Sequence, residues 1–553
     1  MKKIRITYLI IACLFIGGSL HAQVWKAKAI SDLNKGEFAK VEQTISKLSE
    51  AEKGKHAWLI DSLQAMMSRI RDDFRLSREE GKKLLLEKVP GATDKQIESW
   101  KQKKYLETRI IDGEERWFRK TISNFVLLNR ELFTAEMIKD KKKEYAKAHR
   151  NCENILSQPV GVNHTCDWKK VNASFFIEVP ADAVPAGEVI KAWLPYPFDN
   201  GRQRNFQLLS TSSPATHSAG SLHHTVYMEQ KAVKGQPTRF EMKFSYEVGA
   251  QVFPQEEILK SLKPYDKQSD LYKKYTVQEL PHMLVNKQMK TLAQKIVGGE
   301  TNPVLQASMI YDWISANYPW AGAIDYSTIP CMPQYVLDIQ HGDCGQVTLL
   351  YISMLRSLGI PARWESGWVF DETGWTGYHD WGEIYFEGIG WVPTDVSAGR
   401  DTYGERYSDF FKTCTDAYRL ASNEGIGGEL SPKKQYIRRE TVDFQAGEVE
   451  WKGGNLTKWK SNLVIDKIST EADEMKALLA SIKKTFAPDS RVAIYELEAK
   501  KADNQWIIKG KVDKAELKAN VLQELKKANV AVVDSIAVLE FTKEKPWGLV
   551  KLS

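Results

Sequence analysis

Apolar residues recur at intervals of three and four positions through the first part of the chain, residues 23–164. The clearest runs are 33–48, 58–70 and 118–132. Charged and polar residues fill the positions between them, as they do on the solvent-facing side of amphipathic helices. After a break at residues 90–93, we expect a new helix to begin at Asp94. The pattern therefore predicts a helical N-terminal domain over residues 23–164.

The pattern changes near residue 165, where apolar and polar positions begin to alternate. The alternating runs are 171–179, 189–195, 225–228 and 239–248, separated by turns that contain Pro, Gly, Asn or Ser. Short strands at this spacing predict a β-sandwich over residues 165–253. A stretch rich in Pro, Lys and Asp follows, and we expect a linker over residues 254–282.

Helical and strand patterns are mixed over residues 283–425. We expect helices at 304–318 and 345–358, the second ending at the Gly359–Pro361 break, and strands at 362–370, 381–386 and 391–392. A second linker is expected at 426–464. The last segment, 465–553, has the pattern helix, strand, strand, helix, strand. The whole chain is thus predicted to be a multidomain α+β protein with a small α+β domain at its C-terminus.

The first residues have the layout of a secretory signal peptide. A basic start is followed by an apolar run at residues 6–17 and by small and polar residues up to Ala22, after which we expect cleavage. Cys13 offers a lipoprotein alternative, but few apolar residues precede it. We therefore expect export from the cytoplasm to the periplasm or the medium. No later stretch reaches the roughly 18 apolar residues of a membrane helix, so no membrane span is expected.

The net charge of +7 does not indicate nucleic-acid binding once it is divided along the chain. Without residues 1–22 the charge is +4, of which residues 23–150 carry +8 and the remainder −4. The basic residues are interspersed with acidic ones, which is typical of solvated helix faces. No nucleic-acid motif occurs in the chain, so nucleic acid is not an expected partner.

The cysteines are more informative than the charge. Five cysteines follow residue 22, namely Cys152, Cys166, Cys331, Cys344 and Cys414. An odd number in an exported chain leaves at least one free thiol. Cys152 with Cys166, and Cys331 with Cys414, could form disulfides, which would leave Cys344 unpaired. No Cys-x-x-Cys pair occurs, so we expect no structural zinc, and no other metal or cofactor is indicated.

Three residues in the 283–425 segment have the chemistry of a catalytic triad. Cys344 lies at the predicted start of a helix, whose N–H groups and partial positive charge stabilise a thiolate. His379 opens one predicted strand and Asp395 follows another. If these strands are adjacent and antiparallel, nucleophile, base and orienting carboxylate can meet. Singly, a cysteine or histidine in such a place is usually structural; the three in this order favour catalysis.

These residues resemble the transglutaminase-like superfamily of papain-type cysteine enzymes. The resemblance rests on four separated motifs within about 140 residues, which are Gly342-Asp343-Cys344, Leu-Gly-Ile-Pro-Ala-Arg at 358–363, His379-Asp380-Trp381-Gly382-Glu383, and Gly390-Trp391 followed by Asp395. It implies a papain-like or transglutaminase-like α+β core over residues 283–425.

The resemblance also implies residue roles. Cys344 would attack an amide carbonyl and form a thioester, His379 would act as base and then acid, and Asp395 would orient the imidazole. The Cys344 backbone N–H would bind the oxyanion, with Gln340 as a candidate second donor. Trp375 lies in a polar turn beside His379, where it either belongs to the sheet core or lines a groove for peptide or sugar.

Three functions remain open on the sequence alone. The first is an exported cysteine hydrolase that cleaves peptide or amide bonds in a protein, peptide or glycopeptide substrate. The second is a protein-glutamine amine transferase that cross-links through the same triad. The third is a non-catalytic binding or scaffold protein that keeps the fold. The intact Cys, His and Asp argue against the third. The resemblance favours hydrolysis over transfer, because bacterial members with this compact core are more often proteases or amidases and no calcium-loop motif occurs.

Overall fold

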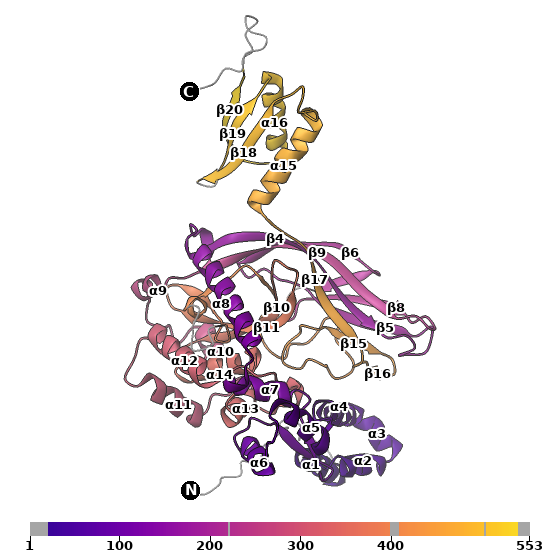
Figure 1. Cartoon of the computed structure of the whole chain (residues 1–553). Coiled ribbons are helices and arrows are strands. Elements are labelled where there is room, and N and C mark those ends of the chain that lie inside the picture. The colour runs from indigo at the N-terminus through magenta and orange to yellow at the C-terminus, as the bar shows by residue number, and fades with distance from the viewer. Residues whose placement is uncertain (1–19, 219–221, 399–408, 503–504, 540–553) are drawn as a thin grey trace, which may run out of the picture. The chain divides into compact units, whose positions relative to one another are not determined.

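A computed structural model of the chain describes residues 20–218, 222–398, 409–502 and 505–539 (Figure 1). The chain divides into two compact units, Met1–Cys166 with Ala173–Ile465 and Asp167–Asn172 with Asp466–Ser553. Most of the predicted signal peptide, residues 1–19, lies outside the described residues. Within the described ranges, no helix combines the length and apolar character that crossing a membrane requires.

The first part of the larger unit is mainly helical, as its apolar spacing predicted. Its helices are α1 (Leu20–Lys35), α2 (Phe38–Ser46), α3 (Glu50–Lys55), α4 (Ala57–Asp73), α5 (Arg78–Lys88), α6 (Asp94–Gln102), α7 (Thr121–Leu128) and α8 (Ala135–Leu156). Helix α6 begins at the predicted residue because Thr93 caps it, its side chain accepting a hydrogen bond from the Gln96 backbone N–H.

A small sheet, which the helical pattern did not predict, interrupts these helices. It contains β1 (Leu76–Ser77), β2 (Thr108–Ile111) and β3 (Glu114–Trp117) in the order β1-β3-β2. The hairpin between β2 and β3 turns at Asp112-Gly113, where both residues have positive φ. An Asp-Gly pair is a strong two-residue hairpin signal, and the strands on either side are too short to show an alternating pattern.

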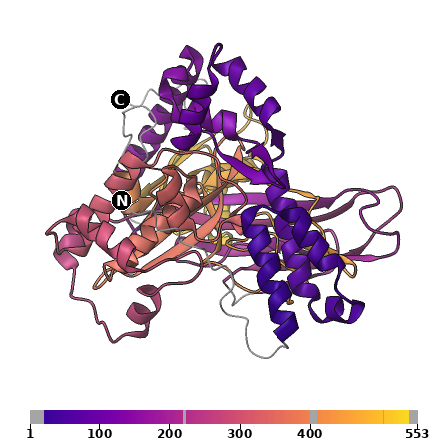
Figure 2. The same cartoon turned by 90° about the horizontal axis from the view of Figure 1, so that it is seen from below.

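The N-terminal helices and the segment after residue 283 share one hydrophobic core. Phe38 of α2 and Leu63 of α4 belong to the same buried cluster as Ile310 of α12 and Leu349 of α14. Figure 2 shows the indigo N-terminal helices beside the pink and orange elements of this unit. The N-terminal helices are therefore packed as part of the larger unit.

Two five-stranded sheets form the β-rich part of the larger unit (Figure 1). Residues 165–252 supply β4 (Thr165–Val179), β5 (Val189–Pro195), β6 (Gln203–Thr211), β7 (Ala215–Ser218), β8 (Thr225–Lys231) and β9 (Thr238–Val252). One sheet has the order β13-β9-β4-β17, with β6 also paired to β9, and the other has the order β16-β15-β5-β8-β7.

Residues 426–464, expected to be a linker, instead help to complete both sheets. They contain β15 (Glu448–Trp451), β16 (Gly454–Asn455) and the start of β17 (Lys460–Thr470). In β15, Glu448 pairs with Trp193 of β5, far away in sequence. β15 and β16 are too short for an alternating pattern to be seen, so they could not be predicted from the sequence. The first expected linker, 254–282, contains two short helices, α9 (Gln255–Ser261) and α10 (Asp270–Tyr275).

The 283–425 segment has the predicted mixture of helices and strands. Its elements are α11 (Lys287–Val297), α12 (Pro303–Asn317), α13 (Met332–Ile339), α14 (Cys344–Ser357), β10 (Ala362–Phe370), β11 (Thr376–Phe386), β12 (Gly390–Thr394), β13 (Cys414–Thr415) and β14 (Arg419–Asn423). The sheet order is β12-β11-β10-β14. Helix α14 packs against β10 and β11 and is buried from Gly345 to Ser357, which fixes its N-terminus relative to the sheet.

The smaller unit has the predicted order of elements. It contains, in the order helix, strand, strand, helix, strand, the elements α15 (Glu471–Phe486), β18 (Tyr495–Ala502), β19 (Gln505–Val512), α16 (Ala515–Lys527) and β20 (Val532–Val538). β18 pairs with β19 in antiparallel and β19 with β20 in parallel orientation. Helix α16 connects the two parallel strands, as such a crossover requires.

The cysteines correct the expected disulfides. Among the described residues, the five cysteines are thiols that form no disulfide with one another. Cys152, Cys166 and Cys414 are buried together in an apolar cluster with Val252 and Phe411. There the sulfurs act as small apolar groups that fill the cluster. Cys331, the expected partner of Cys414, is instead the N-cap of α13.

Candidate active site

Cys344 is the first residue of α14, as predicted. Asp343 caps this helix: its side chain accepts a hydrogen bond from the Gln346 backbone N–H, and the Gln346 side chain accepts one from the Asp343 N–H. Gly345 is needed here, since a Cβ atom at this position would lie 2.3 Å from the Tyr326 hydroxyl and 2.5 Å from Asp380 Oδ2. The chain around the thiol is therefore packed too closely for any other residue type at 345.

His379 and Asp395 meet as the strand argument predicted. β11 and β12 are antiparallel neighbours, and His379 Nε2 lies 2.7 Å from Asp395 Oδ2. The other carboxylate oxygen, Oδ1, accepts hydrogen bonds from the backbone N–H groups of Ser397 and Ala398. The Arg419 guanidinium, itself buried, lies 2.8 Å from Asp395 Oδ2.

These contacts decide how the imidazole is oriented. Burial alone would raise the pKa of Asp395, but the charges and hydrogen bonds of His379 and Arg419 lower it below its ordinary value. Asp395 is thus a carboxylate, which can only accept hydrogen bonds. His379 Nε2 must therefore carry the ring proton and donate a hydrogen bond to Asp395. In the neutral ring, Nδ1 is then the nitrogen with a free lone pair.

The thiol itself is held by the residue that follows His379. Cys344 Sγ donates to Asp380 Oδ2 at 3.5 Å, and the Asp380 backbone N–H donates to the sulfur. Among the described residues, no hydrogen bond joins Sγ to the His379 ring. Burial and the carboxyl groups of Asp380 and Asp343 raise the pKa of Cys344 well above its ordinary value. In the unliganded site, Cys344 is consequently a neutral thiol.

Gln445 connects the His379 backbone to the Asp380 carboxyl group. Its side-chain Nε2 donates to the His379 backbone carbonyl at 2.9 Å and to Asp380 Oδ1 at 2.7 Å. Gln445 is buried and comes from the segment that was expected to be a linker. It holds the 379–380 backbone in place from outside the four-motif region.

The N-terminal helices position one wall of the site. Asn124 of α7 makes two hydrogen bonds to Gly322, with its Nδ2 donating to the carbonyl at 2.8 Å and its Oδ1 accepting from the N–H at 2.9 Å. Asp73, at the end of α4, accepts from the Asp325 N–H at 2.5 Å. The loop fixed in this way presents Tyr326, whose hydroxyl donates to Asp343 Oδ1 at 2.5 Å.

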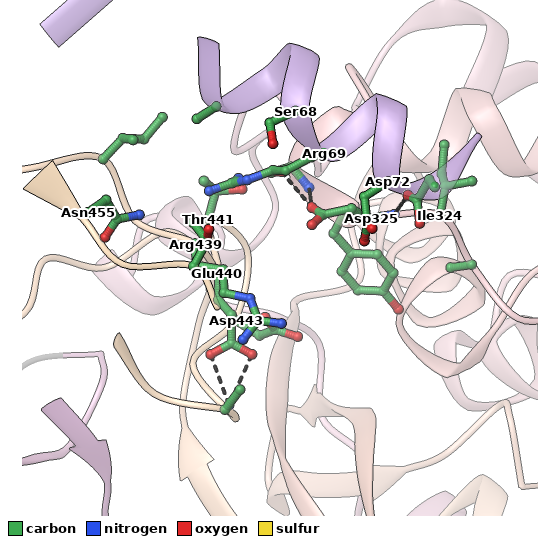
Figure 3. A pocket seen from close by; sticks show the side chains of 18 of the residues that line it. Ser68, Arg69, Asp72, Ile324, Asp325, Arg439, Glu440, Thr441, Asp443 and Asn455 are labelled. Carbon is green, nitrogen blue, oxygen red and sulfur yellow. Dashed lines mark hydrogen bonds between the residues drawn. The ribbon is translucent and has the colours of Figure 1, made fainter. Parts of the chain in front are cut away.

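A cavity of about 810 Å³ opens at Cys344. Figure 3 shows its wall, which comes from α4 (Ser68, Arg69 and Asp72), from the loop of Ile324 and Asp325, and from the loop of residues 439–443. Its volume falls within the range of small-molecule and peptide sites. The cavity is thus bounded by the N-terminal helices on one side and by the thiol on another.

Of the predicted site residues, Cys344 lines this cavity, whereas His379, Asp395, Gln340 and Trp375 do not. Gln340 is exposed and ends α13 in a left-handed conformation, with φ 60° and ψ 29°. Trp375 is 60 % exposed in the turn between β10 and β11. Trp320 and Tyr378, two aromatic residues that the sequence did not single out, line the cavity instead. A role for Gln340 or Trp375 in binding stays a prediction.

Part of the chain matches a known protein family. Residues 290–396 match the model of the Transglutaminase-like superfamily, and this range includes Cys344, His379 and Asp395. These residues form a transglutaminase-like core domain. The predicted family resemblance is thereby confirmed, and with it the multidomain α+β fold class.

Two curated bacterial proteins are similar to part of the chain. An uncharacterized protein of Haemophilus influenzae is 27% identical over 168 residues, which is 24% of this chain and 44% of that protein. The uncharacterized protein YebA of Bacillus subtilis is 27% identical over 139 residues, or 22% of this chain and 19% of YebA. The chain therefore spans less than half the length of these relatives.

Two solved structures are also similar. A candidate cysteine protease from Cytophaga hutchinsonii has a TM-score of 0.38 and 16% identity, with 55% of this chain and 94% of that chain covered. The periplasmic domain of TgpA from Pseudomonas aeruginosa has a TM-score of 0.22 and 12% identity, with 45% and 91% covered.

Proposed function

We propose that this chain is a cysteine hydrolase that cleaves peptide or amide bonds at Cys344. The observation that carries the proposal is the hydrogen bond between His379 and Asp395 at 2.7 Å, beside a cavity that exposes Cys344 at the start of a helix. A nucleophile, a base and an orienting carboxylate on neighbouring elements are what acyl transfer from an amide requires.

In the proposed reaction, His379 Nδ1 takes the thiol proton as Sγ attacks the amide carbonyl. The imidazolium that forms is stabilised by Asp395, which Arg419 keeps ionised. The same proton then passes to the leaving amine, and a thioester remains on Cys344. Water, deprotonated by His379, resolves the thioester and releases the acid.

The oxyanion of the tetrahedral intermediate needs preorganised donors. The Cys344 backbone N–H, at the first position of α14, has no acceptor within the helix and is one proposed donor. Gln340 is the second donor that the family resemblance suggested, and its exposed position would require it to turn toward the substrate.

The starting state of the site adds a condition to this mechanism. Because Asp380 holds the thiol in its neutral form, proton transfer to His379 has to compete with the Asp380 contact. We expect substrate binding to favour the transfer. We also propose that the protein is exported and acts on protein, peptide or glycopeptide outside the cytoplasm, on the basis of the signal-peptide layout of residues 1–22.

The proposal is tested with fluorescein-labelled casein and three forms of the protein. We expect the wild-type protein to release labelled peptides, Cys344→Ala to release none, and the matched control Cys331→Ala to behave as the wild type. Including a fluorescent primary amine separates hydrolysis from amine transfer, since only transfer attaches the amine to casein. Equal cleavage by Cys344→Ala and the wild type would refute the proposal.

A further inference from the structure

The inner end of the cavity at Cys344 is lined by buried carboxyl groups. Asp380 and Asp443 line it together with the thiol, and their residues are only 3% and 7% exposed. Burial and the charge of Asp443 raise the pKa of Asp380 well above its ordinary value. Burial raises the pKa of Asp443 to about 7. Ionisation of these carboxyl groups is therefore unfavourable in the free site, and a bound cation would make their ionisation more favourable.

Asp443 differs from the other carboxyl groups around it because, in the described part of the chain, its own backbone N–H is its only hydrogen-bond donor. Both oxygens of Glu440 accept hydrogen bonds from the Ala446 backbone N–H. Asp343 accepts from Tyr326 and from the Gln346 N–H. In the described part of the chain, no other residue donates a hydrogen bond to the Asp443 carboxyl group. Buried polar groups are nearly always hydrogen-bonded, so an unmet acceptor in a cavity indicates a missing donor.

The cations near this end of the cavity are bound to other groups. Arg69 donates to the Ser327 hydroxyl and to the Arg438 carbonyl. Arg438 lies close enough to Asp443 to lower its pKa. However, Arg438 donates to the backbone carbonyl of Asp443 rather than to the carboxyl group, and its Nε is 3.7 Å from Glu448. The donor that Asp443 lacks is thus not supplied by these arginines.

We propose that Asp443 and Asp380 form a subsite for a primary ammonium group of the substrate, next to the amide that Cys344 attacks. An ammonium group supplies both a positive charge and up to three hydrogen-bond donors, and no other residue in the described part of the chain donates a hydrogen bond to the Asp443 carboxyl group. This inference rests on the proposed hydrolase function and adds its substrate class: amides and peptides with a free amine close to the scissile bond.

The subsite also connects substrate binding to activation of the nucleophile. Asp380 is one of the groups that oppose ionisation of the Cys344 thiol. An ammonium group bound to Asp380 and Asp443 offsets their negative charge, and the thiolate then becomes easier to form. The nucleophile is accordingly activated when a cationic substrate is present and stays neutral otherwise.

The test uses two thiol reagents that differ in charge. Aminoethyl methanethiosulfonate is a cation and sulfonatoethyl methanethiosulfonate an anion, and both form a mixed disulfide with release of methanesulfinate. The rate at each cysteine is followed by mass spectrometry of digested protein at pH 8.5. We expect the cation-to-anion rate ratio at Cys344 to exceed that at Cys331 of the same molecule by at least about tenfold.

Two variants locate the source of this preference. Asp443→Asn should lower the ratio at Cys344 by at least about threefold, whereas Asp72→Asn removes an exposed carboxylate of the same cavity and should change it much less. Should Asp443→Asn fail to fold, the wild-type protein provides a second measurement, since the ratio should fall from pH 8.5 to pH 5.5 as Asp443 and Glu440, whose pKa values are raised to about 7 and about 8, take up their protons.

Equal ratios at Cys344 and Cys331, or equal effects of Asp443→Asn and Asp72→Asn, would overturn the subsite. Because these reagents modify the thiol whether or not the protein hydrolyses amides, the result is independent of the casein assay. Casein cleavage that depends on Cys344 without charge selection would refute the subsite alone. Charge selection without cleavage would refute the hydrolase function.

Discussion

His379 Nε2 donates a hydrogen bond to Asp395 Oδ2 over 2.7 Å, across the neighbouring strands β11 and β12. Asp395 is kept ionised by this contact and by Arg419. The carboxylate therefore fixes which ring nitrogen carries the proton, and it leaves Nδ1 with a free lone pair, as the proposed base requires. Substitution of Asp395 should therefore affect activity more than substitution of a neighbouring carboxylate that does not contact His379.

Replacing Asp395 by Asn should lower the rate of casein cleavage by roughly 10²–10⁴-fold with little change in fold, because an amide can present an N–H to the ring and favour the wrong tautomer. Steady-state cleavage of labelled casein measures the effect. The matched control is Asp416→Asn, which removes another carboxylate facing Arg419, 3.6 Å from its Nε, without contacting His379. Similar losses in both variants would show that the Asp395 effect is structural.

Asp380→Asn should make the Cys344 thiol more reactive. Beyond burial, the Asp380 charge is the next cause of the raised pKa of Cys344, and the asparagine keeps a carbonyl oxygen for Gln445 to bind. We expect alkylation of Cys344 by iodoacetamide at pH 7 to become about 3–10-fold faster, because more of the thiol is ionised. Asp72→Asn serves as the control. An unchanged or slower rate would contradict the assigned role of Asp380.

The buried Asp443 should make the folded protein less stable as the pH rises. Its pKa is raised from the ordinary value of 3.8 to about 7. Between these values the unfolded chain releases the proton while the folded chain keeps it, so stability decreases with pH up to about 7 and then levels off. Relative to wild type, Asp443→Asn should therefore gain stability between pH 5 and pH 8.5, by up to about 3 kcal/mol.

Thermal unfolding of wild type and Asp443→Asn at several pH values measures this difference. The exposed Asp72→Asn variant is the control and should show no pH-dependent gain. A gain of the same size at pH 5 and at pH 8.5 would mean that ionisation of Asp443 is not its cause.

The hydrogen bonds between Asn124 of α7 and Gly322 lead to a prediction about local stability. Asn124→Ala would leave the N–H and the carbonyl of Gly322 without their two partners in a buried place, at a cost of about 1–3 kcal/mol. We expect faster amide hydrogen exchange at residues 321–328, and slower casein cleavage because Tyr326 and Asp325 lose their support. Asn129→Ala, which removes a bond only within its own segment, should leave both unchanged.

The sequence predicted the parts of the site whose signal is local. Cys344 was placed at a helix start, and the antiparallel neighbours that bring His379 to Asp395 followed from short strand patterns on either side of Gly390. Those signals are sufficient because each depends on fewer than a dozen consecutive residues. The strands that complete the sheets, such as β15, are too short to be seen in this way.

What the sequence did not show depends on contacts between distant segments. Asp380 was part of a recognised motif, but its contact with Cys344 depends on how α14 packs on the sheet. Asp443 and Gln445 come from a stretch expected to be a linker, and Asn124 from a helical segment expected to be separate. The disulfide expectation failed for the same reason, because an odd number of cysteines does not reveal that three of them share one apolar cluster.

The most direct test measures the rate of alkylation of Cys344 by iodoacetamide in the wild-type protein and in His379→Ala. Peptide mass spectrometry resolves Cys344 from Cys331, which serves as the reference in the same molecule. If His379 is the base for Cys344, the substitution should slow alkylation of Cys344 at pH 7–8 by at least about tenfold and leave Cys331 unaffected. Equal rates at Cys344 in the two proteins would contradict a catalytic pair of Cys344 and His379.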